Sequence, residues 1–412
     1  MWIVLSSAAA AALIIAGCTS SASTTSRSIA SPVTTPSLGT SAGSTTSTVY
    51  AQLSAAPANQ QLPGSLLSVS CHGTTCVAVG YSSRGGSHAA AALAVYSDDS
   101  GATWKLSRIA NIGTLVGVDC ASSQHCVAVG RRPGSSVLIT VDGGRTWRQA
   151  RFTRKPSYVE NLSCPVVEWC VAVGNPRTAW VTTDAGSSWS PVAVPLISGG
   201  SFGEHLSCVA GGFCLADGRM AVGGSPAVVA TDDYGKSWHV VWDQADRGRP
   251  TGSAPIVDLS AMDCQSANVC LVAGSANKGC PPGCDGEFLR TTDGGRRWSI
   301  VGKAWGGGSE ADVIDCLSGG FCISVGGFVP EIVGTLVVVS RSDGRSWQVP
   351  WRDFLFHLAH QTARGIGIAL ANGVSCTNIR ACVLVGGWDG TPGVLVARSV
   401  DEGYSWRVLP LS

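Results

Sequence analysis

The sequence has few charged residues and no basic run. Its 412 residues include 28 Lys and Arg and 27 Asp and Glu, which is 13% of the chain and gives a formal net charge of +1. Proteins that bind the phosphate backbone of nucleic acids need clustered basic side chains. The composition therefore argues against nucleic acid as a partner.

The chain also lacks the patterns of a helical protein and of a phosphate-binding loop. Apolar residues seldom recur with helical spacing, and no Walker-type motif occurs among the 52 glycines. The apolar residues instead form short, β-branched runs bounded by glycine and polar residues. Such runs are typical of strands that are covered on both faces. We expect an all-β fold in which the glycines serve turns.

An eight-residue motif with the pattern Ser/Thr-x-Asp-x-Gly-x-x-Trp occurs seven times. The copies are Ser97–Trp104, Thr140–Trp147, Thr182–Trp189, Thr231–Trp238, Thr291–Trp298, Ser340–Trp347 and Ser399–Trp406. Only the sixth copy departs from the pattern, because Ser342 stands where the others have Asp. The tryptophans recur every 42 to 60 residues, which indicates one supersecondary unit per repeat.

We call these segments the box turns and expect them to be structural. The Asp and Ser/Thr side chains can bind turn N–H groups, Gly tolerates a positive φ, and the Trp ring can be buried between neighbouring sheets. The structural acidic residues are Asp99, Asp142, Asp184, Asp233, Asp293 and Asp401. Their number alone does not make them catalytic candidates.

A cysteine pair and an apolar run such as CVAVG precede each box turn. The pairs are Cys71/Cys76, Cys120/Cys126, Cys164/Cys170, Cys208/Cys214, Cys264/Cys270, Cys316/Cys322 and Cys376/Cys382, and a further pair is Cys280/Cys284. We expect each pair to form a disulfide across a hairpin, which requires an oxidising compartment. Zinc is the competing interpretation, and the spacing and the separation of the pairs in different repeats disfavour it. We expect no metal and no cofactor.

Each repeat thus offers four short candidate strands. Four-stranded sheets arranged radially, face against face, cover both faces of every sheet. We predict a seven-bladed β-propeller of four-stranded antiparallel blades over residues 62–412, with one disulfide per blade. Each repeat begins with an inner strand, so closure needs no strand exchange, although Ser47–Leu53 could add an edge strand.

The box pattern resembles the bacterial neuraminidase repeat, or Asp-box, which is found in sialidases, xyloglucanases, sortilin-type receptors and photosystem II assembly factors. The resemblance covers residues from about Leu66 to Ser412. It implies that the box lies between the third and fourth strands of a blade, away from the ligand face. The family includes enzymes, receptors and assembly factors, so the resemblance indicates the fold more than the function.

The N-terminal residues indicate export and a lipid anchor. Residues 1–18 form an apolar stretch that ends in Ile15-Ala16-Gly17-Cys18, and this resembles a bacterial lipobox whose cysteine is lipidated. No Lys or Arg precedes the stretch, so the signal is atypical or the true start lies upstream. Residues 19–61 are rich in Ser, Thr, Ala and Pro and predict a disordered tether. We expect the protein at the outer face of a bacterial cell membrane.

The face opposite the box turns carries loops that vary in length, and we expect a ligand there. Insertions occur at Trp242–Asp258, at Ser275–Glu287 and at Pro350–Gly373, of which the third is expected to contain a short helix. His357 and His360 would share one face of that helix, but the sequence fixes no third metal ligand nearby. The candidate ligand-face residues are Arg131, Arg132, Glu204, His205, Asp246, Arg247, Asp285, Glu287, Glu310, Trp351, Asp353, Trp388 and Asp389.

Two classes of function follow. A binding or assembly scaffold for a protein or a glycan needs nothing beyond the fold and this variable face. A sialidase needs an arginine triad and a late tyrosine nucleophile, whereas Tyr234 and Tyr404 lie inside box turns and Arg108-Ile109-Ala110 lacks the family's proline. A hydrolase with another pair of carboxylates stays open as the alternative, and its candidates are Asp246, Asp285, Glu287, Glu310 and Asp353. We expect a scaffold.

Overall fold

A computed structural model describes residues 62–411. Gaps remain at 84–90, 111, 131–135, 154–155, 157–158, 175–177, 195–196, 221–223, 249, 251–254, 277–284, 304–310, 328–334, 351–359, 363–364 and 390–392. The predicted signal, the tether, Cys18, Ser47–Leu53 and the Cys280–Cys284 pair lie outside the described residues. No helix among the described residues is long and apolar enough to cross a membrane.

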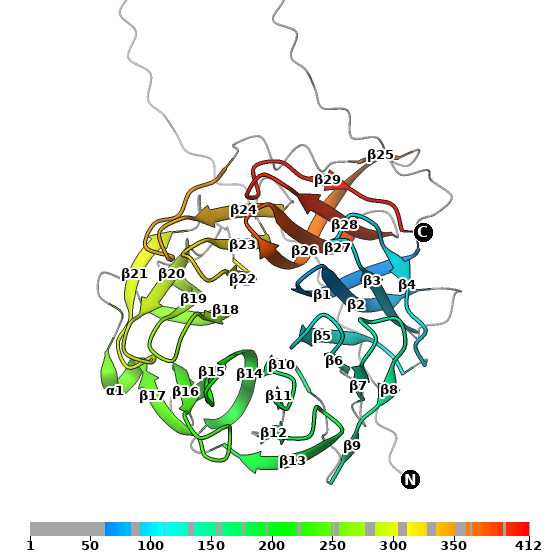
Figure 1. Cartoon of the computed structure of the whole chain (residues 1–412). Coiled ribbons are helices and arrows are strands. Elements are labelled where there is room, and N and C mark those ends of the chain that lie inside the picture. The colour runs from blue at the N-terminus through cyan, green and yellow to red at the C-terminus, as the bar shows by residue number, and fades with distance from the viewer. Residues whose placement is uncertain are drawn as a thin grey trace, which may run out of the picture. The chain divides into compact units, whose positions relative to one another are not determined.

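Seven antiparallel sheets follow one another around a central channel, which confirms the predicted seven-bladed β-propeller (Figure 1). Blade 1 contains β1 (Gly64–His72), β2 (Thr75–Ser82), β3 (Ala91–Ser97) and β4 (Lys105–Leu106). Blade 2 contains β5 (Leu115–Cys120), β6 (Cys126–Gly130), β7 (Val137–Thr140) and β8 (Arg148–Gln149). Blade 3 contains β10 (Asn161–Val166), β11 (Trp169–Gly174), β12 (Thr178–Thr182) and β13 (Ser188–Ala193), and β9 (Arg151–Phe152) joins it in parallel.

The remaining blades repeat the pattern with small variations. Blade 4 contains β14 (Ile197–Val209), β15 (Phe213–Met220), β16 (Pro226–Thr231) and β17 (His239–Asp243), followed by the short α1 (Gln244–Arg247). Blade 5 contains β18 (Ile256–Cys264), β19 (Cys270–Ala276), β20 (Asp285–Thr291) and β21 (Ser299–Lys303). Blade 6 contains β22 (Val313–Cys316), β23 (Cys322–Gly327) and β24 (Thr335–Ser340), and a bridge from Val339 to Gln348 takes the place of its fourth strand. Blade 7 contains β25 (His360–Thr362), β26 (Gly365–Asn378), β27 (Ala381–Asp389), β28 (Val394–Ser399) and β29 (Arg407–Val408).

The short helix predicted in the third insertion is not tested over 351–359, which lies outside the described residues together with His357. Of the described residues, His360–Thr362 and Gly365–Asn378 are strands that pair with each other. The β-branched and glycine-containing sequence GIGIALANG extends the inner strand of blade 7, where it can pair with β27. The four-residue helix α1 lies in the first insertion, where the Asp243 carboxylate accepts a hydrogen bond from the Asp246 backbone N–H.

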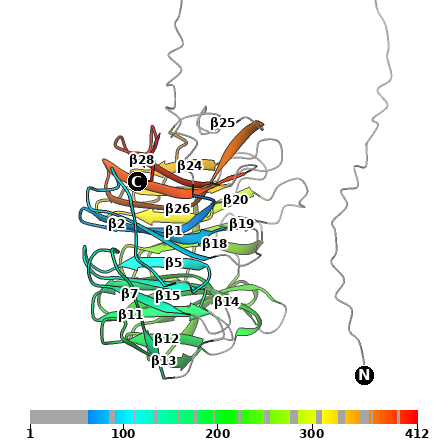
Figure 2. The same ribbon diagram turned by 90° about the vertical axis from the view of Figure 1, so that its right-hand side faces the viewer.

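The hydrophobic core is divided into seven clusters, and each cluster lies between two adjacent blades. For example, Val77 and Val79 of β2 pack against Leu115 and Val118 of β5. Figure 2 shows the ring edge-on, turned by 90° from the view along the channel. Because both faces of every sheet are covered in this way, the strands read as continuous apolar runs in the sequence.

The disulfides and the box turns lie on one face of the ring, as the sequence predicted. Each described disulfide joins the first and second strands of one blade. The bonds are Cys71–Cys76, Cys120–Cys126, Cys164–Cys170, Cys208–Cys214, Cys264–Cys270, Cys316–Cys322 and Cys376–Cys382. The second cysteine of every pair lies directly opposite the first residue of its box turn, as Cys126 lies opposite Thr140. We call this face the disulfide face and the opposite one the open face.

The second cysteine of each pair is a residue of the hydrophobic core. Cys76, Cys126, Cys170, Cys214, Cys270, Cys322 and Cys382 are each 0% exposed. Cys170 lies in one cluster with Val127 and Val129 of blade 2, and Cys214 lies in one cluster with Val171 and Val173 of blade 3. These cysteines lie at the start of the second strands, which the neighbouring blades cover, so at least half of each disulfide is part of the hydrophobic core.

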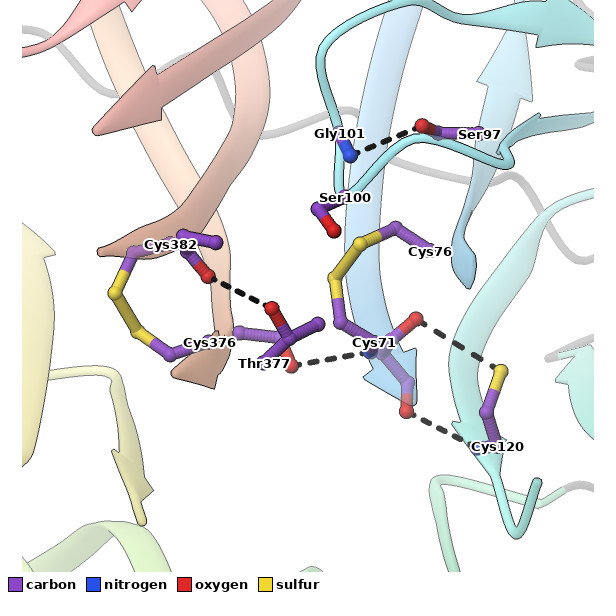
Figure 3. The surroundings of a disulfide bond; sticks show 12 residues. Cys71, Cys76, Ser97, Ser100, Gly101, Cys120, Cys376, Thr377 and Cys382 are labelled. Carbon is purple, nitrogen blue, oxygen red and sulfur yellow. Dashed lines mark hydrogen bonds between the residues drawn. A yellow bond between two sulfur atoms is a disulfide. The ribbon is translucent and has the colours of Figure 1, made fainter. Parts of the chain in front are cut away.

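The ring closes between blades 7 and 1 without exchange of a strand. The Arg398 side chain donates a hydrogen bond from Nε to the Ser100 carbonyl at 2.8 Å. Leu411 forms a parallel bridge with Trp104, so the end of the chain lies against the outer edge of blade 1. Figure 3 shows this junction, where the Cys71–Cys76 and Cys376–Cys382 disulfides lie side by side. The two ends of the propeller are therefore joined by backbone pairing, by the Arg398 hydrogen bond and by an apolar cluster that contains residues of both blades.

Candidate functional site

The central channel contains a cavity of about 490 Å³. All seven inner strands contribute to it. The lining residues are Leu67, Ser68, Val69, Val116, Gly117, Glu160, Asn161, His205, Leu206, Ala261, Met262, Asp312, Val313, Ile314, Asn372, Gly373 and Val374. Its lining includes apolar side chains and the polar or charged side chains of Ser68, Glu160, Asn161, His205, Asp312 and Asn372, and most of its accessible surface is polar.

A β-bulge recurs at the same place on the inner strands and positions the lining residues. In blade 1 the register shifts between Leu66 and Ser68, and blades 2, 5 and 7 shift at the equivalent residues. In blades 3 and 6 the backbone N–H groups of Glu160 and Asp312 donate to Val173 and Val325, which already pair with the next residue. Bulges direct side chains out of the regular alternation and are common beside functional sites.

A ring of hydrogen bonds joins the blades at the end of the channel nearest the disulfide face. In each blade, the residue before the first cysteine accepts a hydrogen bond from the backbone N–H of the first cysteine in the next blade. The acceptors are Ser70, Asp119, Ser163, Ser207, Asp263, Asp315 and Ser375. The three Asp residues accept at 2.7 Å and the four Ser residues at 2.9–3.1 Å. We call these seven residues the seam ring.

The three carboxyl groups of the seam ring titrate abnormally. Burial raises the pKa of Asp119. It also raises the pKa of Asp263 to about 6, although hydrogen bonds from backbone N–H groups act in the opposite direction and lower it. Burial and the charge of Asp263 together raise the pKa of Asp315 to about 8. Asp315 is therefore mostly protonated at neutral pH. Its protonation affects the stability of the ring more directly than the binding of a ligand.

The box turns have the structural role that the sequence predicted. In six of them the Ser/Thr hydroxyl donates to the Asp carboxylate at 2.7–2.9 Å, and in all seven it accepts from the Gly N–H at 2.9–3.0 Å. Burial opposes ionisation of Asp233, but hydrogen bonds from Ser237 and Thr231 outweigh it and lower its pKa to about 2. These carboxylates accept hydrogen bonds within their own turns and so stabilise the geometry of the turn.

His205 is the one ionisable residue of the predicted ligand face that lines the cavity among the described side chains. Its Nδ1 lies 3.0 Å from Oδ2 of Asp217, and its backbone N–H donates to Oδ1 of the same carboxylate at 2.9 Å. Asp217 is only 7% exposed. The sequence contained a signal for Asp217, since its run reads CLADG where other repeats have an apolar residue, but the prediction did not use it.

The other predicted ligand-face residues are distributed as follows. Arg131, Arg132, Glu310, Trp351 and Asp353 lie outside the described residues, and only the backbone is described for Glu204, Asp285 and Asp389. Asp246 and Arg247 are exposed on α1, and Trp388 is half-buried against the core between blades 6 and 7. Among the lining residues that were not predicted, four have carboxyl or amide side chains, namely Glu160, Asn161, Asp312 and Asn372.

Glu287 corrects the prediction, because it is buried inside blade 5 and not on the open face. Only 1% of the residue is exposed, and Nζ of Lys303 lies 3.7 Å from its Oε1. It occupies a central strand position opposite Gly274 and Lys303, in a sheet covered by blades on both sides. Of the five carboxyl groups in the hydrolase hypothesis, the side chains of Glu287 and Asp246 are described, and neither lines the cavity.

Within the described part of the chain, no group of three His, Cys, Asp or Glu side chains is placed to hold a metal ion. The cavity offers the carboxyl groups of Glu160 and Asp312, the imidazole of His205, the bulged backbone and several apolar side chains to a ligand.

Comparison with known proteins supports the fold. No protein-family model and no curated protein matches the chain. A structure of YCF48 bound to D1 peptide is similar with a TM-score of 0.54 and 16% identity, covering 82% of this chain and 95% of that one. YCF48 from Cyanidioschyzon merolae has a TM-score of 0.55, 14% identity and coverages of 82% and 96%. The β-propeller domain of the Trilobed protease from Pyrococcus furiosus has a TM-score of 0.53, 9% identity and coverages of 84% and 96%. At these identities the similarity establishes the fold alone.

Proposed function

We propose that this protein is an exported, lipid-anchored β-propeller that binds a polypeptide at the open face and acts as a binding or assembly scaffold. The observation that carries the proposal is the channel cavity of about 490 Å³, which all seven inner strands line with apolar and hydrogen-bonding groups. A cavity of this composition suits a ligand that offers both an apolar surface and amide groups.

The disulfide face is less suited to this role. Its side chains are engaged in the seam ring, the disulfides and the box turns, as in the bond from Thr146 N–H to Asp142 at 2.9 Å. A similar propeller, YCF48, is bound to a peptide in its structure, which favours a polypeptide over other ligands. Rigid blades with variable loops are a common arrangement for protein recognition.

The binding proposal is tested with the exported full chain immobilised through its N-terminal region. It is screened against random dodecamer peptides displayed on phage and, in parallel, against an array of bacterial cell-wall and capsular glycans. The proposal expects peptides that are enriched and that bind in solution. Enrichment of glycans without any peptide would overturn the polypeptide as ligand and favour a carbohydrate-binding propeller.

The anchor is supported by the segment Ile15-Ala16-Gly17-Cys18 and by seven disulfides, which form and persist in oxidising compartments. Expressed in a bacterial host, the protein is expected in the detergent phase of a Triton X-114 partition, and Cys18→Ala is expected to move it to the aqueous phase. Cys284→Ala is the matched control, since it also removes one cysteine. An unchanged partition of Cys18→Ala would contradict lipidation.

A further inference from the structure

The described disulfides differ in how easily an external reagent reaches their sulfur atoms. The second cysteine of every pair is fully buried, so a reagent can reach only the first cysteine. Of the first cysteines, Cys71 and Cys316 are half-buried. A thiol must touch a sulfur atom to exchange with a disulfide, so burial protects the remaining bonds. Their first cysteines, with exposed fractions of 2–8%, are Cys120, Cys164, Cys208, Cys264 and Cys376.

The surroundings of Cys316 disfavour exchange at that disulfide. Its backbone N–H donates to the carboxylate of Asp263 at 2.7 Å, and Asp315 precedes it in the chain. The pKa of Asp263 is about 6, so this carboxylate is mostly ionised at neutral pH. Leu317, which follows Cys316, packs against the core between blades 6 and 7. The attacking species in exchange is a thiolate anion, and the charge of Asp263 repels it.

Cys71 differs from Cys316 because its hydrogen-bond partner is an uncharged hydroxyl. Its backbone N–H donates to Oγ of Ser375 at 3.1 Å, and the residue before it is Ser70. The Asp119 carboxylate of blade 2 accepts a hydrogen bond from the Ser70 hydroxyl and from the Cys164 N–H, but not from Cys71. The turn after Cys71 is exposed at His72–Thr74. Cys71 thus combines access with weaker repulsion of an incoming thiolate.

This disulfide lies at the junction that closes the ring. Figure 3 shows Cys71 between Cys376 of blade 7 and Cys120 of blade 2. The hydrogen bond from the Cys71 N–H to Ser375 is the seam-ring bond between blades 7 and 1. Cys76 belongs to one apolar cluster with residues of blade 7. Among the described residues, only noncovalent contacts join these two blades, so a change at Cys71 acts directly on ring closure.

We propose that Cys71–Cys76 is a redox-active disulfide that exchanges with an external dithiol, and that its reduction loosens the junction between blades 7 and 1. The inference goes beyond the proposed function and does not depend on polypeptide binding. It adds a modification site on the disulfide face, away from the open face at which a ligand is proposed.

The exchange proceeds in two steps. A thiolate of the dithiol attacks Sγ of Cys71, the bond between the two Sγ atoms breaks, and Cys76 leaves as a thiolate that takes up a proton. The second thiolate of the dithiol then attacks its own sulfur in the mixed disulfide, and Cys71 leaves as a thiolate that is also protonated. The disulfide of the protein has gained two electrons and two protons. The dithiol has lost both and has closed into a disulfide.

The experiment uses the exported full chain with its disulfides formed, without denaturant, and dithiothreitol as the dithiol. Samples are quenched with N-ethylmaleimide at intervals, and peptide mapping by mass spectrometry gives the rate of reduction of each pair. We expect Cys71–Cys76 to be reduced about tenfold or more faster than Cys316–Cys322, with Cys164–Cys170 slower than both. Early quenching after treatment with 2-mercaptoethanol is expected to show the mixed disulfide on Cys71.

Two results would overturn the redox-active disulfide. If Cys164–Cys170 is reduced as fast as Cys71–Cys76, reduction follows unfolding of the chain and the accessible sulfur is not the point of attack. If the 2-mercaptoethanol adduct lies on Cys76, the attack does not occur at the half-buried cysteine. Both results are read from the same peptide maps.

Asp263→Ser is the matched variant, because four blades already have Ser at this position of the seam ring. It removes the charge beside Cys316 and keeps an acceptor for its N–H. We expect reduction of Cys316–Cys322 to accelerate and reduction of Cys71–Cys76 to stay unchanged. High salt screens charges, so it is expected to bring the two rates closer in the wild type. If neither change alters the ratio of the rates, the electrostatic selection of Cys71 is wrong.

The effect on the junction is measured by amide hydrogen exchange at the stage where Cys71–Cys76 alone is reduced. Faster exchange is expected in peptides from β1 and β26, with peptides from β10 of blade 3 unchanged. Unchanged exchange in β1 and β26 would overturn redox control of ring closure. Equal acceleration in β10 would also overturn it, because the whole propeller rather than the junction would then respond.

Discussion

The seam ring predicts an unusual dependence of stability on pH, which Asp315→Ser tests. Burial and Asp263 raise the pKa of Asp315 to about 8 in the folded chain, against 3.8 for an unperturbed aspartate. Between these values the unfolded chain has released the proton and the folded chain still holds it. A raised pKa contributes stability that is present below about pH 4 and is lost as the pH rises through about 8.

The magnitude follows from the linkage relation. One proton held by the folded state alone changes the free energy of unfolding by about 1.4 kcal/mol per pH unit. From pH 4 to pH 7 the loss is on the order of 4 kcal/mol, which is a large part of the about 5–15 kcal/mol that stabilises a typical domain. Asp263 titrates in the same range with a pKa of about 6, and its contribution is coupled to that of Asp315.

Asp315→Ser removes the titrating group and keeps the acceptor. Four blades already use Ser at this position, and Ser375 accepts the Cys71 N–H at 3.1 Å. We expect the variant to lose most of the fall in stability between pH 4 and pH 8, and to exceed the wild type above pH 7. Guanidinium unfolding with the disulfides intact, at one-unit intervals from pH 4 to pH 9, measures this directly.

Asp232→Asn is the control, because Asp232 is an exposed carboxyl of a box turn. It is expected to leave the pH profile unchanged. If Asp315→Ser shows the same slope as the wild type, then Asp315 does not hold a proton at neutral pH and does not set the pH dependence of stability.

Two further predictions concern the box turns and the disulfides. Ser342→Asp is expected to raise the free energy of unfolding by about 1 kcal/mol, because the sixth box turn would then have the carboxylate that the other six have. In the present chain the Ser342 hydroxyl accepts the Ser346 N–H at 2.9 Å. A lower unfolding midpoint of the variant would contradict the structural role of these carboxylates. Replacing Cys71 and Cys76 by Ser is expected to lower the free energy of unfolding by about 2 kcal/mol, the entropy of a short closed loop. Urea unfolding of this variant beside the equivalent Cys164 and Cys170 variant of blade 3 would show whether the junction between blades 7 and 1 is weaker than a junction within the ring.

The fold was predictable because its determinants are local and repeated. The box turns are closed by bonds between residues two to four positions apart, such as Ser97 Oγ to Asp99, and the cysteines pair across one hairpin turn. Because the motif occurs seven times, the single exception at Ser342 does not hide the pattern. Periods of this kind report a supersecondary unit even where no single copy is decisive.

The site was less predictable because it depends on contacts between repeats. The seam ring has a plain sequence signal, Ser or Asp before each first cysteine, but its meaning appears only when blade n meets blade n+1. Glu160 and Asp312 reach the cavity through bulges, and no alternation rule places a bulged residue. Glu287 was misplaced for the opposite reason, since its charge suggested a surface whereas its strand position is central.

The pairing of every described disulfide within one hairpin bears on how the chain would acquire its structure after the export proposed above. Each of these cysteines finds its partner five or six residues away, and none of the described bonds links one blade to another. Oxidation can therefore proceed in order as the chain leaves the translocation channel, with each nascent hairpin sealed before the next appears. Close partners meet far more often than distant ones, so such a chain has little need of an isomerase to correct its bonds.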